Sequence, residues 1–370
     1  MISGDPTKVS IVVRAFNEAE HIERLLIGIG AQTMTPHEVI LVDSGSTDDT
    51  VAIASAYGAR IVHVDKAEFT FGRALNRGCA SATGEICVFT SAHVYPVCST
   101  WLEKLVEPFQ DERVALSYGR QTGNDKNKFS EHQIFAQWFP AESVCPQPTH
   151  FCNNANAAIR RSLWEELPYD ETLTGLEDLA WAKAARARGN WIAYVAEAVI
   201  VHVHDETWKQ VQDRYRREAM AMRLIEEHAQ FTRGDLARLL TQNVLSDVRA
   251  ARRQDLLRKE LRSIFMFRYH QLTGTYRGYN GPSEASAQLR ARFYYAGSNG
   301  QNGHRSAASE DVIDYAALEA EARHAQLEDR RHWSLGLARN QRDDPGRTDE
   351  DGSRSGSVLN GFTAERAVVD

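Results

Sequence analysis

An acidic residue stands at the carboxyl end of a predicted strand, in the run from Leu41 to Thr50, where a turn of small residues and a predicted helix follow. Open α/β sheets bind their ligands at the carboxyl ends of strands. The carboxylate of Asp43 can accept hydrogen bonds from a base or a ribose, and Ser46 or Thr47 can cap a helix that begins near Asp48. The run therefore predicts either a nucleoside contact or a plain capped turn.

Two histidines, His202 and His204, end a later predicted strand, and the alternation of that strand places both imidazoles on one face. They can bind a metal ion or a diphosphate, or they can form a solvent-facing stripe. We prefer His204 as the ligand because it lies nearer the strand's end. Arg214 and Arg217 then share one face of a predicted helix. A guanidinium there can neutralise a departing diphosphate, although Arg214 can also form a surface ion pair with Glu218.

A pair of acids, Glu177 and Asp178, opens a predicted helix that has basic residues near its end and stops at Gly189. Acids in the first turn complement the helix dipole, so this effect explains the pair without any chemistry. It does not explain the polar run at residues 153–156, which places amides where a network of sugar hydroxyls would need them. The segment therefore also predicts a sugar-binding site.

Short β-rich runs alternate with helical stretches from Lys8 to about Tyr118, a pattern typical of parallel βαβ units. Gly58, Gly78 and Gly84 fall where predicted helices end, and residues 99–100 fall where one begins. The alternation predicts an α/β fold with a doubly wound, mostly parallel sheet flanked by helices, as in nucleotide-binding domains.

The later part of the chain changes in composition. Helical patterns begin at Trp208, and stretches rich in Gly, Ser and charge follow Tyr279. We expect a catalytic domain at residues 1–206, a helical extension packed on it at 207–280, and a largely flexible tail at 281–370 with a helix at 312–329.

Composition excludes several classes of protein. The 370 residues are 42% hydrophobic and 25% charged, which indicates a folded globular protein. A net charge of -7 provides no basic field for nucleic acid, so we expect no nucleic-acid partner. The first ten residues lack a secretory pattern, and no window is apolar enough for a spanning helix. Five cysteines without a CxxC pair predict reduced thiols and a cytoplasmic protein.

The motif RAFNE at residues 14–18, followed by a strand that ends in DSGSTDDT at 43–50, resembles the opening of the inverting family 2 glycosyltransferases. Their nucleotide-sugar domain has the GT-A fold, and the rhamnosyltransferase-like branch is the most similar. The resemblance covers about residues 8 to 220. It implies Asp178 as the catalytic base, oriented by Glu177. It also implies a nucleotide site formed by Asn17, Glu18, Asp43, Ser44 and Ser46, and a donor or acceptor site formed by Arg120, Gln121, Asn154, Asn156 and Trp181.

Members of that family carry an acidic metal-binding motif at the end of the strand that here reads FTSAHVYP, and His93 holds the position of the aspartate. The resemblance therefore implies a metal or diphosphate site that contains His93, His202, His204 and Arg214. The expected cofactor is a divalent cation, Mn²⁺ or Mg²⁺. Imidazole suits Mn²⁺ or Zn²⁺ better than Mg²⁺, which prefers hard oxygen ligands.

Together these motifs predict an inverting hexosyl- or deoxyhexosyltransferase that moves a sugar from a nucleoside-diphosphate sugar to an acceptor hydroxyl, in the synthesis of a surface polysaccharide or glycoconjugate. The expected partners are that donor and a glycan or lipid-linked acceptor. Mixed apolar and basic runs after Trp208 predict either peripheral contact with the inner face of the membrane or a helix packed on the core.

The histidine in the metal motif leaves a second function open, a non-catalytic nucleotide-sugar-binding or scaffold protein of the same fold. A nucleotidyltransferase would need a Gly-rich phosphate loop near the amino terminus, which RAFNE does not provide.

Overall fold

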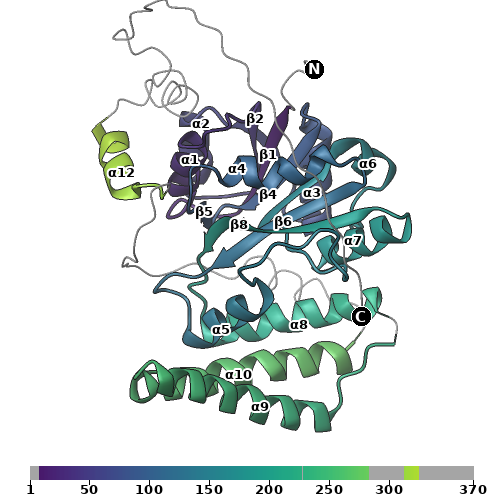
Figure 1. The fold of residues 1–370 in the computed structure, drawn as a ribbon, viewed down its shortest axis with the longest axis vertical. Coiled ribbons are helices and arrows are strands. Elements are labelled where there is room, and N and C mark those ends of the chain that lie inside the picture. Colours follow the sequence, from purple (N-terminus) through teal and green to yellow (C-terminus); the bar gives the residue numbers. More distant parts are fainter. Residues whose placement is uncertain (1–7, 227, 283–311, 325–370) are drawn as a thin grey trace, which may run out of the picture.

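The computed structural model describes residues 8–226, 228–282 and 312–324, and its centre is an eight-stranded sheet (Figure 1). The order of strands in the sheet is β3-β2-β1-β4-β7-β6-β8-β5. The strands are β1 (Val9–Ala15), β2 (Glu38–Asp43), β3 (Arg60–His63), β4 (Ile86–Ser91), β5 (Val94–Pro96), β6 (Val114–Thr122), β7 (Asn156–Arg160) and β8 (Trp191–His202).

Most of the strand pairs are parallel. Parallel pairing joins β1 to β2 and β4, β2 to β3, and β6 to β8, whereas β7 runs antiparallel between β4 and β6 and β5 runs antiparallel to β8. Helices return the chain to the same edge between successive parallel strands, so the carboxyl ends of β1, β2 and β4 meet at one edge. The predicted doubly wound, mostly parallel sheet is confirmed.

Helices cover both faces of the sheet, and β1 shows why. Its side chains alternate, so that Ile11 and Val13 join the apolar core on one face and Val12 joins the core on the other. The first face is covered by α1 (Ile22–Gly30), α2 (Thr50–Ala56) and α4 (Trp101–Val106), and a 3₁₀ turn at Glu107–Gln110 follows α4. The second face is covered by α3 (Phe71–Ser81), α6 (Arg161–Glu166), α7 (Glu177–Ala187) and the carboxyl end of α5 (Phe129–Trp138).

Three further helices follow β8 and lie below the sheet in Figure 1: α8 (Trp208–Ile225), α9 (Arg233–Arg253) and α10 (Leu257–Asn280). A capping box starts α8, because the Thr207 hydroxyl accepts the N–H of Gln210 and the Gln210 side chain accepts the N–H of Thr207. A buried ion pair of 2.7 Å joins Asp247 of α9 to Arg268 of α10. Helices thus occupy the stretch in which the sequence predicts them.

The helix α12 (Tyr315–His324) packs beside α1, although almost the whole described chain separates the two (Figure 1). Arg24 Nε lies 2.6 Å from Glu319 Oε1, and the hydroxyl of Tyr315 donates to the carbonyl oxygen of Pro96 at 2.7 Å. A Cβ atom on Gly28 of α1 would collide with that hydroxyl. The helix begins at Tyr315 rather than at 312; residues 325–329 of the predicted helix lie outside the described residues, as do 283–311 and 330–370 of the predicted tail.

Two predictions about helix ends are wrong. The helix after Asp43 begins at Thr50 rather than near residue 48, and no side chain caps it; Asp48 instead accepts the N–H of Thr50. Gly78 lies inside α3 and does not end it. A Cβ atom on Gly78 would collide with Val12, so this glycine lets α3 approach β1 closely.

Two predictions about the class of protein can be compared with the structure. None of the helices in the described ranges is both long and apolar enough to cross a membrane. All five cysteines are unpaired thiols, and Cys79, Cys87 and Cys152 are buried. The prediction of free cysteines is confirmed.

Candidate active site

A cavity of about 760 Å³ opens where the carboxyl ends of β1, β2 and β4 meet the end of β8 and the first turns of α7 and α8. Of the residues that the sequence assigns to a site, those that line it are Asn17, Glu18, Ser44, His93, Asn154, Glu177, Asp178, His202, His204 and Arg214. The sheet topology therefore brings together residues from seven separate segments at the edge where such folds bind ligands.

Glu177 and Asp178 form the first turn of α7, as the sequence predicts. Asp178 accepts the N–H of Asn154 through Oδ2 and the N–H of Leu179 through Oδ1, both at 2.9 Å. Glu177 forms an ion pair of 3.2 Å with Arg14 of β1. The two carboxylates are both buried yet have different partners, so their chemistry differs.

The surroundings of Asp178 make its carboxylate a proton acceptor near neutral pH. Burial, and after it the charge of Glu177, raises the pKa of Asp178 to about 7, although the two backbone donors and Arg14 oppose that rise. A general base works best when its pKa lies near the operating pH. Asp178 has that property, and its carboxylate lies in the cavity wall.

The loops after β1 and β2 are tied together by hydrogen bonds. Asn17 adopts a left-handed backbone (φ 54°), donates its N–H to Ser46 Oγ at 2.9 Å and accepts the N–H of Thr47 at 2.8 Å. The carboxylate of Asp43 accepts the N–H groups of Gly45 and Ser46, each at 3.1 Å. Among the described residues, Asp43 and Ser46 are not part of the cavity wall, so they shape the turn that presents Asn17.

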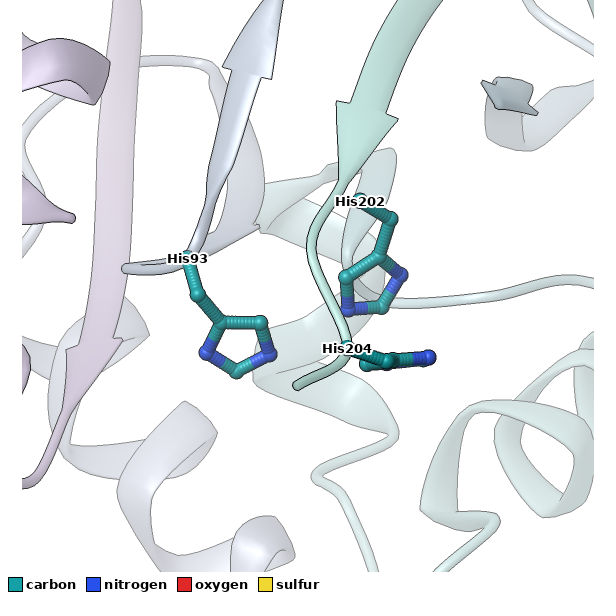
Figure 2. A group of neighbouring side chains, drawn as sticks. All are labelled: His93, His202 and His204. Carbon is teal, nitrogen blue, oxygen red and sulfur yellow. The ribbon is translucent and has the colours of Figure 1, made fainter. Parts of the chain in front are cut away.

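Three histidines gather on one side of the cavity, and Figure 2 shows His93 facing the pair formed by His202 and His204. The N–H at Nδ1 of each ring is held by an oxygen: His93 by Glu18 at 2.7 Å, His202 by Gln121 Oε1 at 2.8 Å and His204 by Glu131 at 2.8 Å. The prediction that His202 and His204 share a face agrees with their common place in the cavity wall.

His93 and His202 differ in their ease of protonation. Burial, then the neighbouring His204 and His93, lowers the pKa of His202 well below its usual value. For His93, burial also disfavours the charged ring, but the carboxylate of Glu18 outweighs it and the pKa of His93 is raised. His202 is therefore a neutral ring with a lone pair.

Arg214 is buried against two carboxylates. Its Nη2 lies 2.6 Å from Glu131 and 2.7 Å from Glu206. Burial alone would raise the pKa of Glu131, but His204 and Arg214 outweigh that effect and hold this pKa below its usual range. The surface pair between Arg214 and Glu218 that the sequence offered as an alternative is wrong, because Arg214 is turned inward to these other acids.

The cavity wall carries an excess of negative charge. Nine carboxyl groups line it against three guanidinium groups, and no lysine is among the described residues of the wall. The acids are Glu18, Glu20, Asp48, Glu177, Asp178, Asp205, Glu206, Asp213 and Glu218, and the arginines are Arg14, Arg214 and Arg217. An anionic ligand that enters this cavity needs a further cation.

The predicted donor or acceptor residues divide into two groups. Asn154 lines the cavity, and both polar atoms of its side chain are buried without a hydrogen-bond partner in the described part of the chain. The other predicted residues lie outside the wall. Gln121 holds His202, Asn156 accepts the indole N–H of Trp101, Trp181 donates to the carbonyl of Leu167 in the core, and Arg120 offers its carbonyl oxygen to Asn156.

Arg14 and Glu131 belong to the site but were not assigned from the sequence. Arg14 stacks over the ring of Phe71, as does Arg217, which the sequence offers beside Arg214 as a diphosphate contact; they lie 5.1 and 4.8 Å from the ring centroid. Arg14 stands inside the RAFNE motif, which is a signal that could have identified it. Glu131 lies in a segment without clean periodicity, and no sequence signal marks it as the partner of His204.

Comparison with known proteins agrees with this geometry. The pattern of Glycosyl transferase family 2 matches residues 10–167. The chain is 29% identical over 220 residues to the O-antigen chain rhamnosyltransferase RfbN of Salmonella typhimurium, a match that covers 56% of this chain and 70% of RfbN. It is 33% identical over 195 residues to the O-antigen chain rhamnosyltransferase WbaN of Salmonella anatum, covering 50% of this chain and 62% of WbaN.

A solved structure shares the fold. The mannosyltransferase PcManGT from Pyrobaculum calidifontis, in complex with GDP-Man and Mn²⁺, is similar with a TM-score of 0.51 at 20% identity, over 74% of this chain and 87% of that one. The expected GT-A type of fold is confirmed by this likeness.

Proposed function

We propose that this chain, whose residues 10–167 match the pattern of Glycosyl transferase family 2, transfers a hexose or deoxyhexose, with inversion, from a nucleoside-diphosphate sugar to an acceptor hydroxyl. The two rhamnosyltransferase relatives support a deoxyhexose and an acceptor in surface polysaccharide synthesis. The observation that carries the proposal is the cavity that joins the acid pair of α7 to the loop of Asn17 and to three imidazoles.

In the proposed reaction the acceptor oxygen attacks the anomeric carbon of the donor sugar. The bond from that carbon to the diphosphate oxygen breaks, the diphosphate leaves with the bonding electrons, and Asp178 Oδ takes the hydroxyl proton. Glu177, held by Arg14, keeps the negative field that makes Asp178 basic. General-base help of this kind contributes about 10²- to 10⁴-fold to a rate.

The departing diphosphate develops negative charge that the site must stabilise. A divalent cation held by His93, His202 and His204 would supply that stabilisation. Arg217 lines the same wall and stacks on Phe71, which orients its guanidinium toward the cavity side of α8. Asn154, with two buried and unpartnered polar atoms, is placed to hydrogen-bond sugar hydroxyls.

Thermal-shift measurements with UDP, GDP, dTDP and CMP, each with and without Mn²⁺ or Mg²⁺, test the proposal first. We expect one nucleotide to raise the melting temperature and so to name the donor class. Release of the nucleoside diphosphate from that donor then reports turnover. Asp178→Asn should abolish transfer and leave nucleotide binding close to wild type, whereas Glu166→Gln, at an exposed acid outside the cavity wall, should change neither.

Two outcomes contradict the proposal in different ways. Nucleotide binding without any transfer would favour the non-catalytic nucleotide-sugar-binding protein. Undiminished turnover in Asp178→Asn would remove Asp178 from the role of base.

We also propose that the chain contacts an anionic membrane surface through α10, where lipid-linked acceptors lie. Leu261, Phe265 and Tyr269 recur at every fourth position and are 51%, 51% and 41% exposed, and Lys259 and Arg262 are exposed beside them. Exposed apolar side chains flanked by cations are typical of helices that lie in the membrane interface.

Sedimentation with vesicles tests this contact. Vesicles that contain phosphatidylglycerol should bind the wild type, and Phe265→Ser should bind several-fold less. Leu224→Ser is the matched control, because Leu224 is 54% exposed but lies on α8. Equal binding of all three proteins, or no binding to anionic vesicles, would contradict the proposed contact.

A further inference from the structure

Three imidazoles from two distant segments converge beside the cavity. His93 follows β4, whereas His202 ends β8 and His204 comes two residues later. One ring nitrogen from each lies within 4.8 Å of those of the other two, and the ring centroids of His202 and His204 are 4.0 Å apart. In Figure 2 the rings of His93 and His202 each turn a nitrogen toward the other. Three nitrogen donors thus surround a space of the size that one metal ion occupies.

The hydrogen bonds at Nδ1 leave the opposite nitrogen of each ring available. Glu18, Gln121 and Glu131 hold the Nδ1 atoms at 2.7, 2.8 and 2.8 Å. Metal-binding histidines commonly donate their other N–H to such a carboxylate or amide oxygen, which fixes the ring and its tautomer. His202 is only 7% exposed, and no group in the described ranges bonds to its buried Nε2 atom. A buried lone pair without a partner points to a ligand.

We propose that His93, His202 and His204 bind one transition-metal ion through Nε2 and prefer Zn²⁺, Co²⁺ or Mn²⁺ to Mg²⁺. An all-nitrogen donor set suits borderline transition ions, whereas Mg²⁺ requires hard oxygen ligands and gives up its water reluctantly. Three protein ligands leave at least one coordination position open to a diphosphate oxygen. The role of the ion in donor binding rests on the proposed function, but the binding of the ion itself does not.

The charge of the cavity gives a second reason for a cation at this place. Two of the three arginines in the wall, Arg14 and Arg214, are already paired with Glu177 and with Glu131 and Glu206. A nucleoside diphosphate would add further negative charge beside the excess of carboxylates. Three neutral imidazoles leave the full charge of a divalent ion available to that ligand.

A second group of metal-binding side chains, Glu131, His204 and Glu206, lies next to the first. The guanidinium of Arg214 already contacts both of its carboxylates, at 2.6 and 2.7 Å. A cation therefore stands where a metal would have to bind, and Glu131 is used to hold Nδ1 of His204. The three-histidine group is the better site.

Metal titration of the untagged full chain without nucleotide tests the proposal. Co²⁺ should bind with a stoichiometry of one and produce visible absorption bands, and Zn²⁺ should displace it. Calorimetry should find Mg²⁺ at least about 100-fold weaker than Zn²⁺, given the donor set. His202→Ala should weaken Co²⁺ binding by about 100-fold or more, and Glu18→Ala, which frees only Nδ1 of His93, by about 10- to 100-fold.

Two further variants make the test specific. His37→Ala is the matched control, since His37 is exposed at the start of β2, and it should bind Co²⁺ like the wild type. His93→Asp replaces a nitrogen with oxygen donors and should move the preference at least tenfold toward Mg²⁺. His93 is partly exposed, with 28% of its side chain accessible, so this change tests the site even if His202→Ala fails to fold.

The outcomes separate the metal site from the proposed function. Mg²⁺ binding as tight as that of Zn²⁺, Co²⁺ binding unchanged in His202→Ala, or an unchanged metal preference in His93→Asp, would overturn the inference. Loss of Co²⁺ binding in His202→Ala, together with a shift of preference toward Mg²⁺ in His93→Asp, supports it. If the ion binds in this way and no nucleotide changes the melting temperature, the metal site stands and the proposed function fails.

Discussion

The pH dependence of turnover follows from the surroundings of Asp178 and can be shifted in both directions by single substitutions. The pKa of Asp178 is raised from 3.8 to about 7, about three pKa units or about 4 kcal/mol at 1.36 kcal/mol per unit. Burial is the larger cause and Glu177 the next, so Glu177 raises the pKa of Asp178 by less than burial does. Glu177→Gln should therefore lower the apparent pKa by about one unit.

Two neighbours of Asp178 do not titrate in the same range. Cys152 and Tyr169 face it, and burial raises the pKa of each above its already high usual value, so both stay neutral between pH 5 and 9. Arg14 acts in the opposite direction to Glu177, because its positive charge stabilises the carboxylate of Asp178. Arg14→Gln should accordingly raise the apparent pKa.

The assay is kcat/KM for nucleoside diphosphate release, measured between pH 5 and 9. The wild type should lose activity as the pH falls below about 7, Glu177→Gln below about 6, and Arg14→Gln at a higher pH than wild type. Asp178→Asn should be at least about 100-fold slower and should lack this limb. The reasoning would be refuted if wild-type kcat/KM fell only below pH 5. It would also be refuted if the pH at which activity is lost moved in the same direction in Glu177→Gln and Arg14→Gln.

The free energy of unfolding, measured against pH, reports the pKa of Asp178 without a substrate. The folded protein raises the pKa of Asp178, so it favours the protonated carboxyl group. Below about pH 4, Asp178 is protonated in both the folded and the unfolded protein, and it costs no stability. As the pH rises from about 4 to about 7, the free energy of unfolding falls by up to about 4 kcal/mol. The stability of Asp178→Asn relative to wild type should rise over that window and then level off. A difference that is independent of pH would contradict the assignment.

Three further outcomes are expected. Gly78→Ala should destabilise the fold by about 1–2 kcal/mol in urea unfolding, because overpacking against Val12 outweighs the gain in helix propensity; an increase in stability would contradict the close packing of α3 on β1. Asp43→Ala should weaken nucleoside diphosphate binding several-fold by calorimetry, because it loosens the turn that presents Asn17; an unchanged dissociation constant would remove Asp43 from the site. Dialysis against EDTA should abolish the nucleotide-induced thermal shift, and Mn²⁺ should restore it better than Mg²⁺; a full shift after chelation would assign the diphosphate to side chains alone.

The features that could be predicted from the sequence depend on signals local in the chain. Glu177 and Asp178 start a helix because acids favour its first turn, and the place of His202 and His204 follows from the alternation of one strand. His93 is found because the family resemblance gives it the position of a metal-binding aspartate. The parallel topology brings these strand ends to one edge, so the positions proposed for the metal and for the base could be predicted from the sequence.

The remaining site residues depend on contacts between distant segments. Glu131 has partners 73 and 83 positions away, and nothing in its own segment indicates them. Asn156 and Trp181 have side chains suited to sugars, yet the pairing of β7 and the packing of α7 turn them into the core. The motifs that contain these residues did not indicate which face of the strand or helix each side chain occupies.

The packing of α12 on α1 has a consequence for how the sequence can change in evolution. Glycine is the only residue type at position 28 that leaves room for the Tyr315 hydroxyl, and that hydroxyl donates to the carbonyl oxygen of Pro96. A Cβ atom at position 28 would collide with Pro96 as well as with the Tyr315 hydroxyl, so it would disturb the contact of α1 with β5 and with α12 together. We therefore expect a glycine at position 28 in relatives that keep both contacts.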